Sequence, residues 1–299
     1  MIRQFFIFLL ILSVGAVVAL NFKSIMAMGQ ERIINQQAEK AVSVKNWESA
    51  IALYQQGHRE HPGNSRITLR LVWLKLMNNQ PDEAEALYRE VLKNEPEHLE
   101  ANMGLAALLA TQPKHVNQAV ILLRQAVKTH PDNPRLIAQI GDLYRISAEN
   151  PQEIRPEVKQ QLYDTALYYY RESLKLNARQ FQTQFNVGVS NQAINQSQEA
   201  AQAYCKAVAL NPASYEARYN LGLVLSDLNY QEEAFRQMSQ AVQQLGENGD
   251  MTSAQALAIK VQNVKNRVLL SGNHGLSSNV NPEFLEKGCL VQPLAEEKR

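Results

Sequence analysis

The feature that most constrains this fold is a sequence period of about 34 residues. Small side chains recur at Ala50, Ala84, Ala119, Ala166, Ala200 and Ala234, separated by 34, 35, 47, 34 and 34 residues. A bulky side chain lies four residues after each, at Tyr54, Tyr88, Leu123, Tyr170, Tyr204 and Met238. A proline lies twelve residues after four of them, at Pro62, Pro96, Pro131 and Pro212. This pattern predicts units that each pack on their neighbours, so chain length here counts repeats rather than separate cores.

At these offsets the sequence resembles the tetratricopeptide repeat family, with six units in register over residues 31–248. The resemblance implies an all-α fold of paired antiparallel helices. It also implies that the units stack into a right-handed superhelix, whose concave groove holds partner polypeptides. Helical spacing places Gly222 and Ala234 on facing helices, where the absence of side-chain bulk allows close approach. We therefore expect these two residues to be structural.

Three segments depart from the period. About thirteen extra residues, 147–159, fall between the helices of repeat four, and Pro156 suits the first position of a lengthened second helix. The insert is either a second contact surface or a tolerated surface loop. Residues 249–270 predict a capping helix, which would cover the apolar side of the last repeat. Residues 271–299, rich in Gly, Asn and Ser, predict a flexible tail.

The N-terminal segment, residues 1–30, contains an uncharged apolar run over residues 5–20, behind a short basic start with Arg3. The run is slightly shorter than the roughly 20 residues that span a bilayer, but Asn21, Phe22 and the snorkelling Lys23 can extend it. We expect one transmembrane helix acting as a signal anchor. The alternative is a cleavable signal peptide that releases the repeats. Either would place the repeat domain outside the cytoplasm, in the periplasm or an equivalent compartment.

The net charge and the absence of known motifs argue against several classes of function. The chain has 30 Lys and Arg against 29 Asp and Glu, so it lacks the basic footprint of a nucleic-acid-binding protein. No phosphate-binding loop, nucleophile elbow or zinc-protease motif is present, which predicts no enzymatic activity, no cofactor and no small-molecule substrate. His58 and His61 share a helical face without a third marked ligand, so no metal site is expected. Cys205 and Cys289 have no metal or redox spacing, although a disulfide between them is an open alternative outside the cytoplasm.

Candidate binding residues come from the resemblance, which implies that the second, fifth, sixth and ninth positions of each first helix line the groove. In repeats five and six these positions include Phe185, Asn186, Val189, Tyr219, Asn220 and Leu223. An asparagine amide both donates and accepts, so it can pair with a peptide backbone. Asn186 and Asn220 therefore either grip an extended peptide or tie one repeat to the next.

Nearer the N-terminus the same positions carry Arg66, Arg70 and Trp73, with Arg135 in repeat four. Arginine pairs bidentately with carboxylates, so an acidic partner segment is one interpretation and scattered solvated charges are the other. The sequence thus predicts a membrane-anchored scaffold that binds a protein or extended peptide and supports assembly of a cell-envelope complex. The alternatives are a docking subunit that regulates an envelope enzyme or secretion machine, and a secreted form of the same repeat protein.

Overall fold

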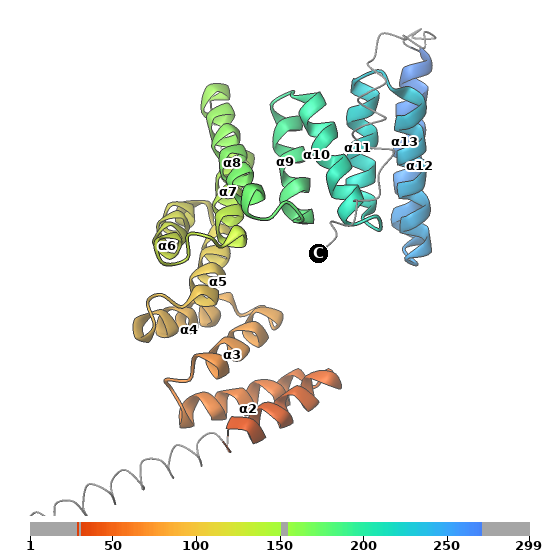
Figure 1. The fold of residues 1–299 in the computed structure, drawn as a ribbon. Coiled ribbons are helices and arrows are strands. Elements are labelled where there is room, and N and C mark those ends of the chain that lie inside the picture. The colour runs from red at the N-terminus through yellow and green to blue at the C-terminus, as the bar shows by residue number, and fades with distance from the viewer. Residues whose placement is uncertain (1–28, 30, 151–154, 271–299) are drawn as a thin grey trace, which may run out of the picture. The chain divides into compact units, whose positions relative to one another are not determined.

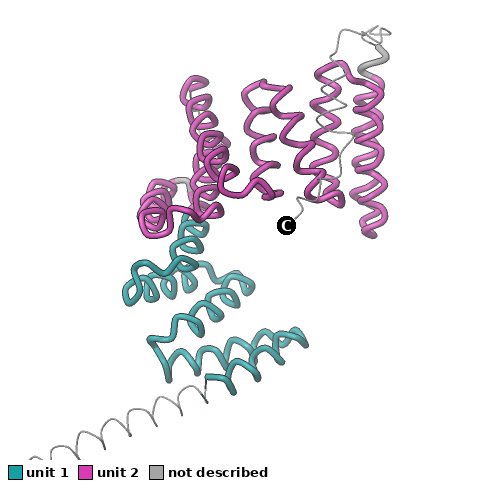
Figure 2. Tube along the Cα trace, viewed as in Figure 1, with its two compact units in different colours: residues 1–109 teal, residues 110–299 magenta. Residues whose placement is uncertain are grey.

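The computed structural model describes residues 29, 31–150 and 155–270, and every regular element in these residues is a helix (Figure 1). The chain divides into two compact units, Met1–Leu109 and Ala110–Arg299 (Figure 2). Each unit is built from consecutive helices that turn back on one another. The helix order matches six helical pairs followed by one closing helix, which confirms the predicted repeats and cap.

Unit 1 contains a first helix over residues 31–43, then α2 (Trp47–Glu60), α3 (Ser65–Met77), α4 (Pro81–Asn94) and α5 (Leu99–Ala110), the last residue of which belongs to unit 2. One hydrophobic core of this unit lies between the first helix, α2 and α3. The buried members are Ile34, Ala38, Ala50, Tyr54, Ile67, Leu71 and Leu74. Small residues at Ala38 and Ala50 let the first two helices approach, while Tyr54 fills the space beside them.

Unit 2 continues with the short 3-10 helix η1 (Pro113–His115), α6 (Val116–Thr129), α7 (Pro134–Glu149), α8 (Pro156–Leu176), α9 (Phe181–Ala193), α10 (Ser197–Leu210), α11 (Tyr215–Asp227), α12 (Gln231–Glu247) and α13 (Met251–Leu270). The hairpins are α7 with α8, α9 with α10, and α11 with α12, and α13 packs on α12. A core cluster of this unit lies around Tyr204, Leu221, Leu225 and Met238.

Local sequence signals set the helix limits. Side chains of Asn46, Asn64, Asn133 and Ser214 each accept the backbone N–H three residues on, which satisfies a donor that the first turn leaves unpaired. The recurrent prolines follow the ends of α2, α4, α6 and α10 by two residues. A proline disfavours helical geometry in the residue before it, so the recurring prolines mark where the second helix of each of these repeats ends.

Close helix packing depends on Gly222, as predicted. A Cβ on this residue would lie 2.5 Å from Met238 Cγ and 2.9 Å from the Ala234 carbonyl oxygen. The second atom belongs to the α12 backbone, which cannot move without moving the helix. Gly222 therefore sets how near α11 and α12 approach.

The connection between the helices differs among the repeats. Lys45, Asn79, Asn195 and Asn229 have positive φ angles of 58°, 55°, 61° and 66°, each in a turn between the two helices of one repeat. Asparagine tolerates this left-handed geometry better than most residues, whereas a lysine is strained in it. In repeat four, α7 extends to Glu149 and α8 begins at Pro156, so part of the predicted 147–159 insert is helical; residues 151–154 lie outside the described residues.

Several predictions fall outside the described residues. These are the N-terminal anchor or signal peptide within residues 1–28 and the tail over residues 271–299. Among the helices of the described ranges, none combines the length and apolar character needed to cross a membrane. The alternative disulfide also falls outside them, because Cys205 is buried in α10 but Cys289 is not among the described residues.

Candidate peptide-binding site

Helix α3 places three predicted binding residues on one exposed face. The helix begins after Asn64, whose Oδ1 accepts the Ile67 N–H at 3.2 Å. One face, with Ile67, Leu71 and Leu74, is buried in the core of unit 1. Residues three, four and seven apart share a helical face, so Arg66, Arg70 and Trp73 emerge together on another side.

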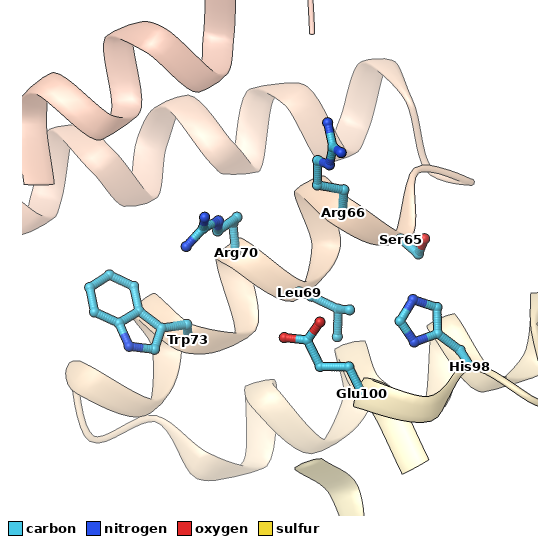
Figure 3. A pocket seen from close by; sticks show the side chains of 7 residues that line it. All are labelled: Ser65, Arg66, Leu69, Arg70, Trp73, His98 and Glu100. Atoms are coloured by element: carbon cyan, nitrogen blue, oxygen red, sulfur yellow. The ribbon is translucent and has the colours of Figure 1, made fainter. Parts of the chain in front are cut away.

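These side chains open on a common pocket of about 550 Å³, lined by Ser65, Arg66, Leu69, Arg70, Trp73, His98 and Glu100 (Figure 3). Helix α3 supplies the first five residues, and the start of α5 with the loop before it supplies the last two. Two cations, one carboxylate and two apolar side chains thus surround one open space. Such a mixture can hold a polypeptide segment through its side chains and its backbone together.

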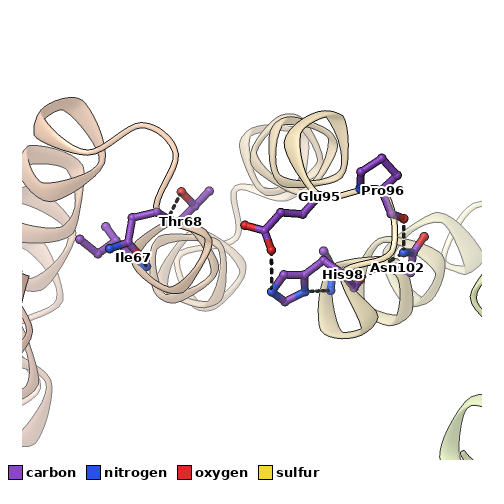
Figure 4. A network of polar contacts seen from close by, with 8 residues as sticks. Ile67, Thr68, Glu95, Pro96, His98 and Asn102 are labelled. Atoms are coloured by element: carbon purple, nitrogen blue, oxygen red, sulfur yellow. Dashed lines mark hydrogen bonds and ion pairs between the residues drawn. The ribbon is translucent and has the colours of Figure 1, made fainter. Parts of the chain in front are cut away.

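The α5 side of the pocket is held in place by a buried asparagine (Figure 4). Asn102 Nδ2 donates to the carbonyl oxygens of Pro96 and His98, at 2.9 and 3.1 Å. His98 Nδ1 accepts the Ala101 N–H at 3.3 Å, and its Nε2 lies 3.9 Å from a Glu95 carboxylate oxygen. These bonds fix the loop that leads into α5, and therefore the positions of His98 and Glu100.

Among the residues that the structure describes, the charge partners of both pocket arginines are distant. Arg66 Nη1 lies 3.8 Å from Glu31, and Arg70 Nε lies 3.7 Å from Glu39. The arginine side chains are 77% and 57% exposed. Exposed pairs of this kind are screened by water and salt, and typically contribute about 0 to 1 kcal/mol. The two guanidinium groups therefore remain accessible to a partner.

The first helix also contacts the core through Glu39. Tyr54 Oη donates to Glu39 Oε1 at 3.2 Å. Burial raises the pKa of Tyr54 to about 12, and the nearby Glu39 carboxylate adds to the increase. Glu39 therefore accepts from Tyr54 while lying near Arg70, and it connects the first helix, α2 and α3.

The apolar end of the site is aromatic. Trp73 is 41% exposed, and its ring meets the ring of Trp47 edge-on, with centroids 6.1 Å apart. Leu76 and Met77, at the end of α3, are exposed as well. A half-exposed tryptophan supported by a second ring offers a rigid apolar surface with little conformational entropy to lose on binding.

In unit 2 the predicted apolar residues flank one core. Phe185, Val189, Tyr219 and Leu223 are half-buried and pack against the cluster around Tyr204. Phe185 meets the Tyr204 ring edge-on, with centroids 5.7 Å apart. Arg135 is exposed in the first turn of α7. The structure thus gathers the apolar residues of repeats five and six along one cluster.

The two predicted asparagines make contacts between repeats. Asn186 is 5% exposed, and its Nδ2 donates to Asp142 Oδ1 of α7 at 2.6 Å. The same oxygen accepts the Tyr170 hydroxyl at 2.8 Å. Asn220 is half-buried and hydrogen-bonds the hydroxyl of Tyr204, in the preceding repeat. These contacts favour the interpretation in which the asparagines tie one repeat to the next, and a peptide-gripping role remains a prediction.

Asp142 is an ionisable group inside this joint. Burial raises the pKa of its carboxyl, and the hydrogen bonds from Tyr170 and Asn186 and the nearby charge of Arg145 oppose the increase. Burial also raises the pKa of Tyr170, with the Asp142 carboxylate contributing. The network holds α7, α8 and α9 together through directional bonds.

Four pocket residues and Asp142 are not among the residues predicted from the sequence. Leu69 is the fifth position of its helix, Glu100 the second position of repeat three and Asp142 the ninth of repeat four, so the same positional rule, applied to every repeat, would have found them. Ser65 and His98 lie outside that rule. His58 Nδ1 contacts Thr68 Oγ1 at 3.1 Å, and no group of three or more potential metal ligands occurs in the residues that the structure describes.

Stacked helical hairpins that leave an open pocket of charged and aromatic side chains define a class, the helical repeat proteins. Within that class, tetratricopeptide repeat models match residues 41–108, 75–140 and 188–249, which together cover more than half of the chain. The chain belongs to the tetratricopeptide repeat family. Domains of this family bind protein or peptide partners and are typically not enzymes, so this chain is a protein-binding scaffold.

Individual relatives are distant. The uncharacterized protein y4yS of Sinorhizobium fredii (strain NBRC 101917 / NGR234) is 33% identical over 78 residues, which span 26% of this chain and 42% of that protein. This chain therefore matches less than half the length of that relative.

Among solved structures, PilW, described as a widely conserved type IV pilus biogenesis factor, gives a TM-score of 0.61 at 15% identity, covering 76% of this chain and 97% of that one. TTC0263 of Thermus thermophilus, described as a thermophilic TPR protein, gives 0.53 at 20% identity, covering 67% and 98%. At these identities the likeness shows the fold alone.

Proposed function

We propose that this protein is a membrane-tethered scaffold that holds a segment of a partner protein in the α3 pocket, outside the cytoplasm, and supports assembly of a cell-envelope complex. The main support for this binding site is the pocket itself. Arg66, Arg70 and Trp73 lie on successive turns of α3 and face the same space as Glu100 of α5. Arginine and tryptophan are over-represented among the residues that dominate binding energy at protein interfaces.

The pocket suits a polypeptide better than a compact ligand. It is open, and its polar groups are spread along about two turns of α3. An extended segment can follow such a surface, because it presents side chains and backbone groups at regular intervals. The partner residues would contact both sides, with side chains toward α3 and backbone donors toward Glu100.

Membrane tethering rests on the sequence of the N-terminal segment. The uncharged run over residues 5–20, with Arg3 before it and Lys23 after it, supports an anchor with a cytoplasmic N-terminus. The fold is also that of PilW, described as a type IV pilus biogenesis factor, so the fold is compatible with a role in building an envelope structure.

In-cell photo-crosslinking tests the binding site. A photoreactive amino acid at Leu69 should capture a single protein, identifiable by mass spectrometry. A matched photoreactive residue at Asp82, exposed on α4 and not lining the pocket, should not capture it. Trp73→Ala in the Leu69 background should abolish capture. Equal capture from both positions, or none from Leu69, would refute the pocket as the binding site.

Unit 2 is tested in the same cells. A photoreactive residue at Tyr219, compared with and without Asn220→Ala, asks whether repeats five and six also contact the partner. Tethering is tested separately by carbonate extraction of membranes and by protease access to intact and permeabilised cells. A full-length chain found in the soluble cytoplasmic fraction would contradict the proposed location and leave the pocket result unaffected.

A further inference from the structure

The spacing of side chains along α3 restricts which extended segment can bind. A helix rises about 1.5 Å per residue, so Arg70 lies about 6 Å and Trp73 about 10.5 Å along the axis from Arg66. In an extended segment, side chains two residues apart point the same way and lie about 6.6 Å apart. Two alternate residues can therefore face the two arginines at once. The next same-face residue, about 13 Å along, falls nearest to the Trp73 end of the pocket.

Charge at the N-terminal half of α3 favours carboxylates. The pairs of Arg66 with Glu31 and of Arg70 with Glu39 each involve one guanidinium nitrogen at 3.8 and 3.7 Å. A partner carboxylate can approach closer and pair with two nitrogens, which is stronger and more directional. The positive end of the α3 dipole lies at the same end of the helix as Arg66. An acidic side chain of the partner is therefore attracted to this end of α3, where it competes with Glu31 and Glu39 for the two arginines.

Glu100 opposes a continuous acidic run. It lines the pocket from α5, across from the α3 residues (Figure 3). In an extended segment the residue between two alternate acids points to the opposite side, so it points away from the arginines. An acidic residue there would meet Glu100 with like charge, whereas a neutral residue leaves Glu100 to accept backbone N–H donors. The pocket therefore distinguishes alternate from adjacent acidic residues.

The C-terminal half of α3 is apolar. Trp73 is supported by Trp47 and bordered by the exposed Leu76 and Met77. Exposed apolar surface next to a charged patch is typical of an interaction site, and a large aliphatic or aromatic partner residue would remove it from water.

We propose that the α3 pocket selects an extended segment with the order acidic, non-acidic, acidic, any residue, large apolar. The acids bind Arg66 and Arg70, displacing Glu31 and Glu39, and the apolar residue packs on Trp73. This inference rests on the proposed function, because it names the chemistry of the segment held by the same pocket. It also gives the first helix a role, since Glu31 and Glu39 weaken the site for acidic segments.

The test uses the full-length chain in detergent and a fluorescein-labelled peptide, Gly-Ser-Glu-Ser-Glu-Ser-Leu-Ser-Gly, measured by fluorescence anisotropy at low salt. The rearranged peptide Gly-Ser-Glu-Glu-Ser-Ser-Leu-Ser-Gly has the same composition and net charge. We expect it to bind at least about threefold more weakly, because only one acid can face α3. A peptide with glutamine in place of both glutamates should bind about tenfold more weakly, since charge-assisted bonds are lost.

Protein variants provide the complementary arm. The Arg66→Gln/Arg70→Gln double variant should weaken binding about tenfold and reduce its salt dependence. The Glu31→Gln/Glu39→Gln double variant should strengthen binding several-fold, because the competing carboxylates are gone. Circular dichroism should show unchanged helicity in both variants, because the two arginines are exposed and the two glutamates make exposed or partly exposed contacts.

Absence of peptide binding, equal binding of the rearranged peptide, or indifference to the arginine substitutions would overturn the proposed selectivity. Capture from Leu69 in cells that persists in the Arg66→Gln/Arg70→Gln variant would retain the scaffold function and reject only the acidic motif. Loss of all capture from Leu69 in the otherwise unaltered protein would reject the function itself.

Discussion

Replacing Gly222 by alanine tests how closely the helices of a repeat are packed. The new Cβ would lie 2.5 Å from Met238 Cγ and 2.9 Å from the Ala234 carbonyl oxygen. Met238 can move, but the carbonyl belongs to α12, so the helices must separate. Overpacking of this kind costs about 1 to 3 kcal/mol. Alanine also improves helix propensity by about 0.8 to 1.0 kcal/mol. The net loss of stability is therefore about 0 to 2 kcal/mol.

Gly246→Ala provides a matched control on the adjoining helix. Its Cβ would lie 3.8 Å from Met251 Sδ and 3.9 Å from Ala254 Cβ, which are ordinary contacts. This variant keeps the propensity gain, at most about 1 kcal/mol near the end of α12, and adds no overlap. The difference between the two variants largely removes the propensity contribution, and it should be about 1 to 3 kcal/mol, the steric cost alone.

The assay combines urea denaturation with hydrogen exchange measured by mass spectrometry. Gly222→Ala should lower the urea midpoint and Gly246→Ala should leave it equal or higher. Because repeats interact mainly with their neighbours, faster exchange in Gly222→Ala should concentrate in α11, α12 and α13. Equal midpoints for the two variants, or faster exchange spread evenly over both units, would refute the close-contact explanation.

Three further predictions follow from single contacts. Lys45→Gly should raise the free energy of unfolding by about 0.5 to 1 kcal/mol, because lysine is strained at a φ of 58°; an unchanged or lower urea midpoint would contradict this. Asn102→Ala should cost about 1 to 3 kcal/mol, since it removes the donors to the Pro96 and His98 carbonyls; a loss below about 0.5 kcal/mol would show that the loop holds without them. Burial raises the pKa of the Asp142 carboxyl above its unfolded value, so the native state binds the carboxyl proton more tightly than the unfolded state does. The free energy of unfolding should therefore decline as pH rises from about 4, the unfolded pKa, through the folded pKa. Asp142→Asn, which can still accept both hydrogen bonds, should remove that decline in pH-dependent urea melts, whereas Asp142→Ala should destabilise at every pH; parallel profiles for the native chain and Asp142→Asn would exclude this assignment.

Much of the fold was predictable because small and bulky side chains recur at fixed positions in each repeat. Ala234 and Met238 recur with their equivalents in every unit, and these small and bulky side chains pack together between paired helices. The positive φ at Lys45 was not predictable in the same way. Its side chain is not one that favours left-handed geometry, so only the equivalent turns with Asn79, Asn195 and Asn229 reveal the requirement.

The residues predicted from sequence cover only the α3 side of the binding site. Arg66, Arg70 and Trp73 share helical spacing within one segment, and that spacing indicates a common face. Glu100 occupies the second position of repeat three, so the same positional rule marks it as a groove residue, but only the structure shows that it faces α3 across the pocket. Likewise, the sequence could not decide what Asn186 binds, because that depends on the carboxylate presented by a different repeat.

The joint at Asp142 has a mechanical consequence. One carboxylate oxygen receives a donor from α8, in its own hairpin, and another from α9, in the next. Apolar attraction has no preferred direction, whereas two short hydrogen bonds that converge on one atom weaken steeply when their geometry is displaced. If a bound partner pulls on unit 2, the boundary between repeats four and five should therefore resist shear. The repeats should separate first at boundaries that only apolar side-chain packing holds together.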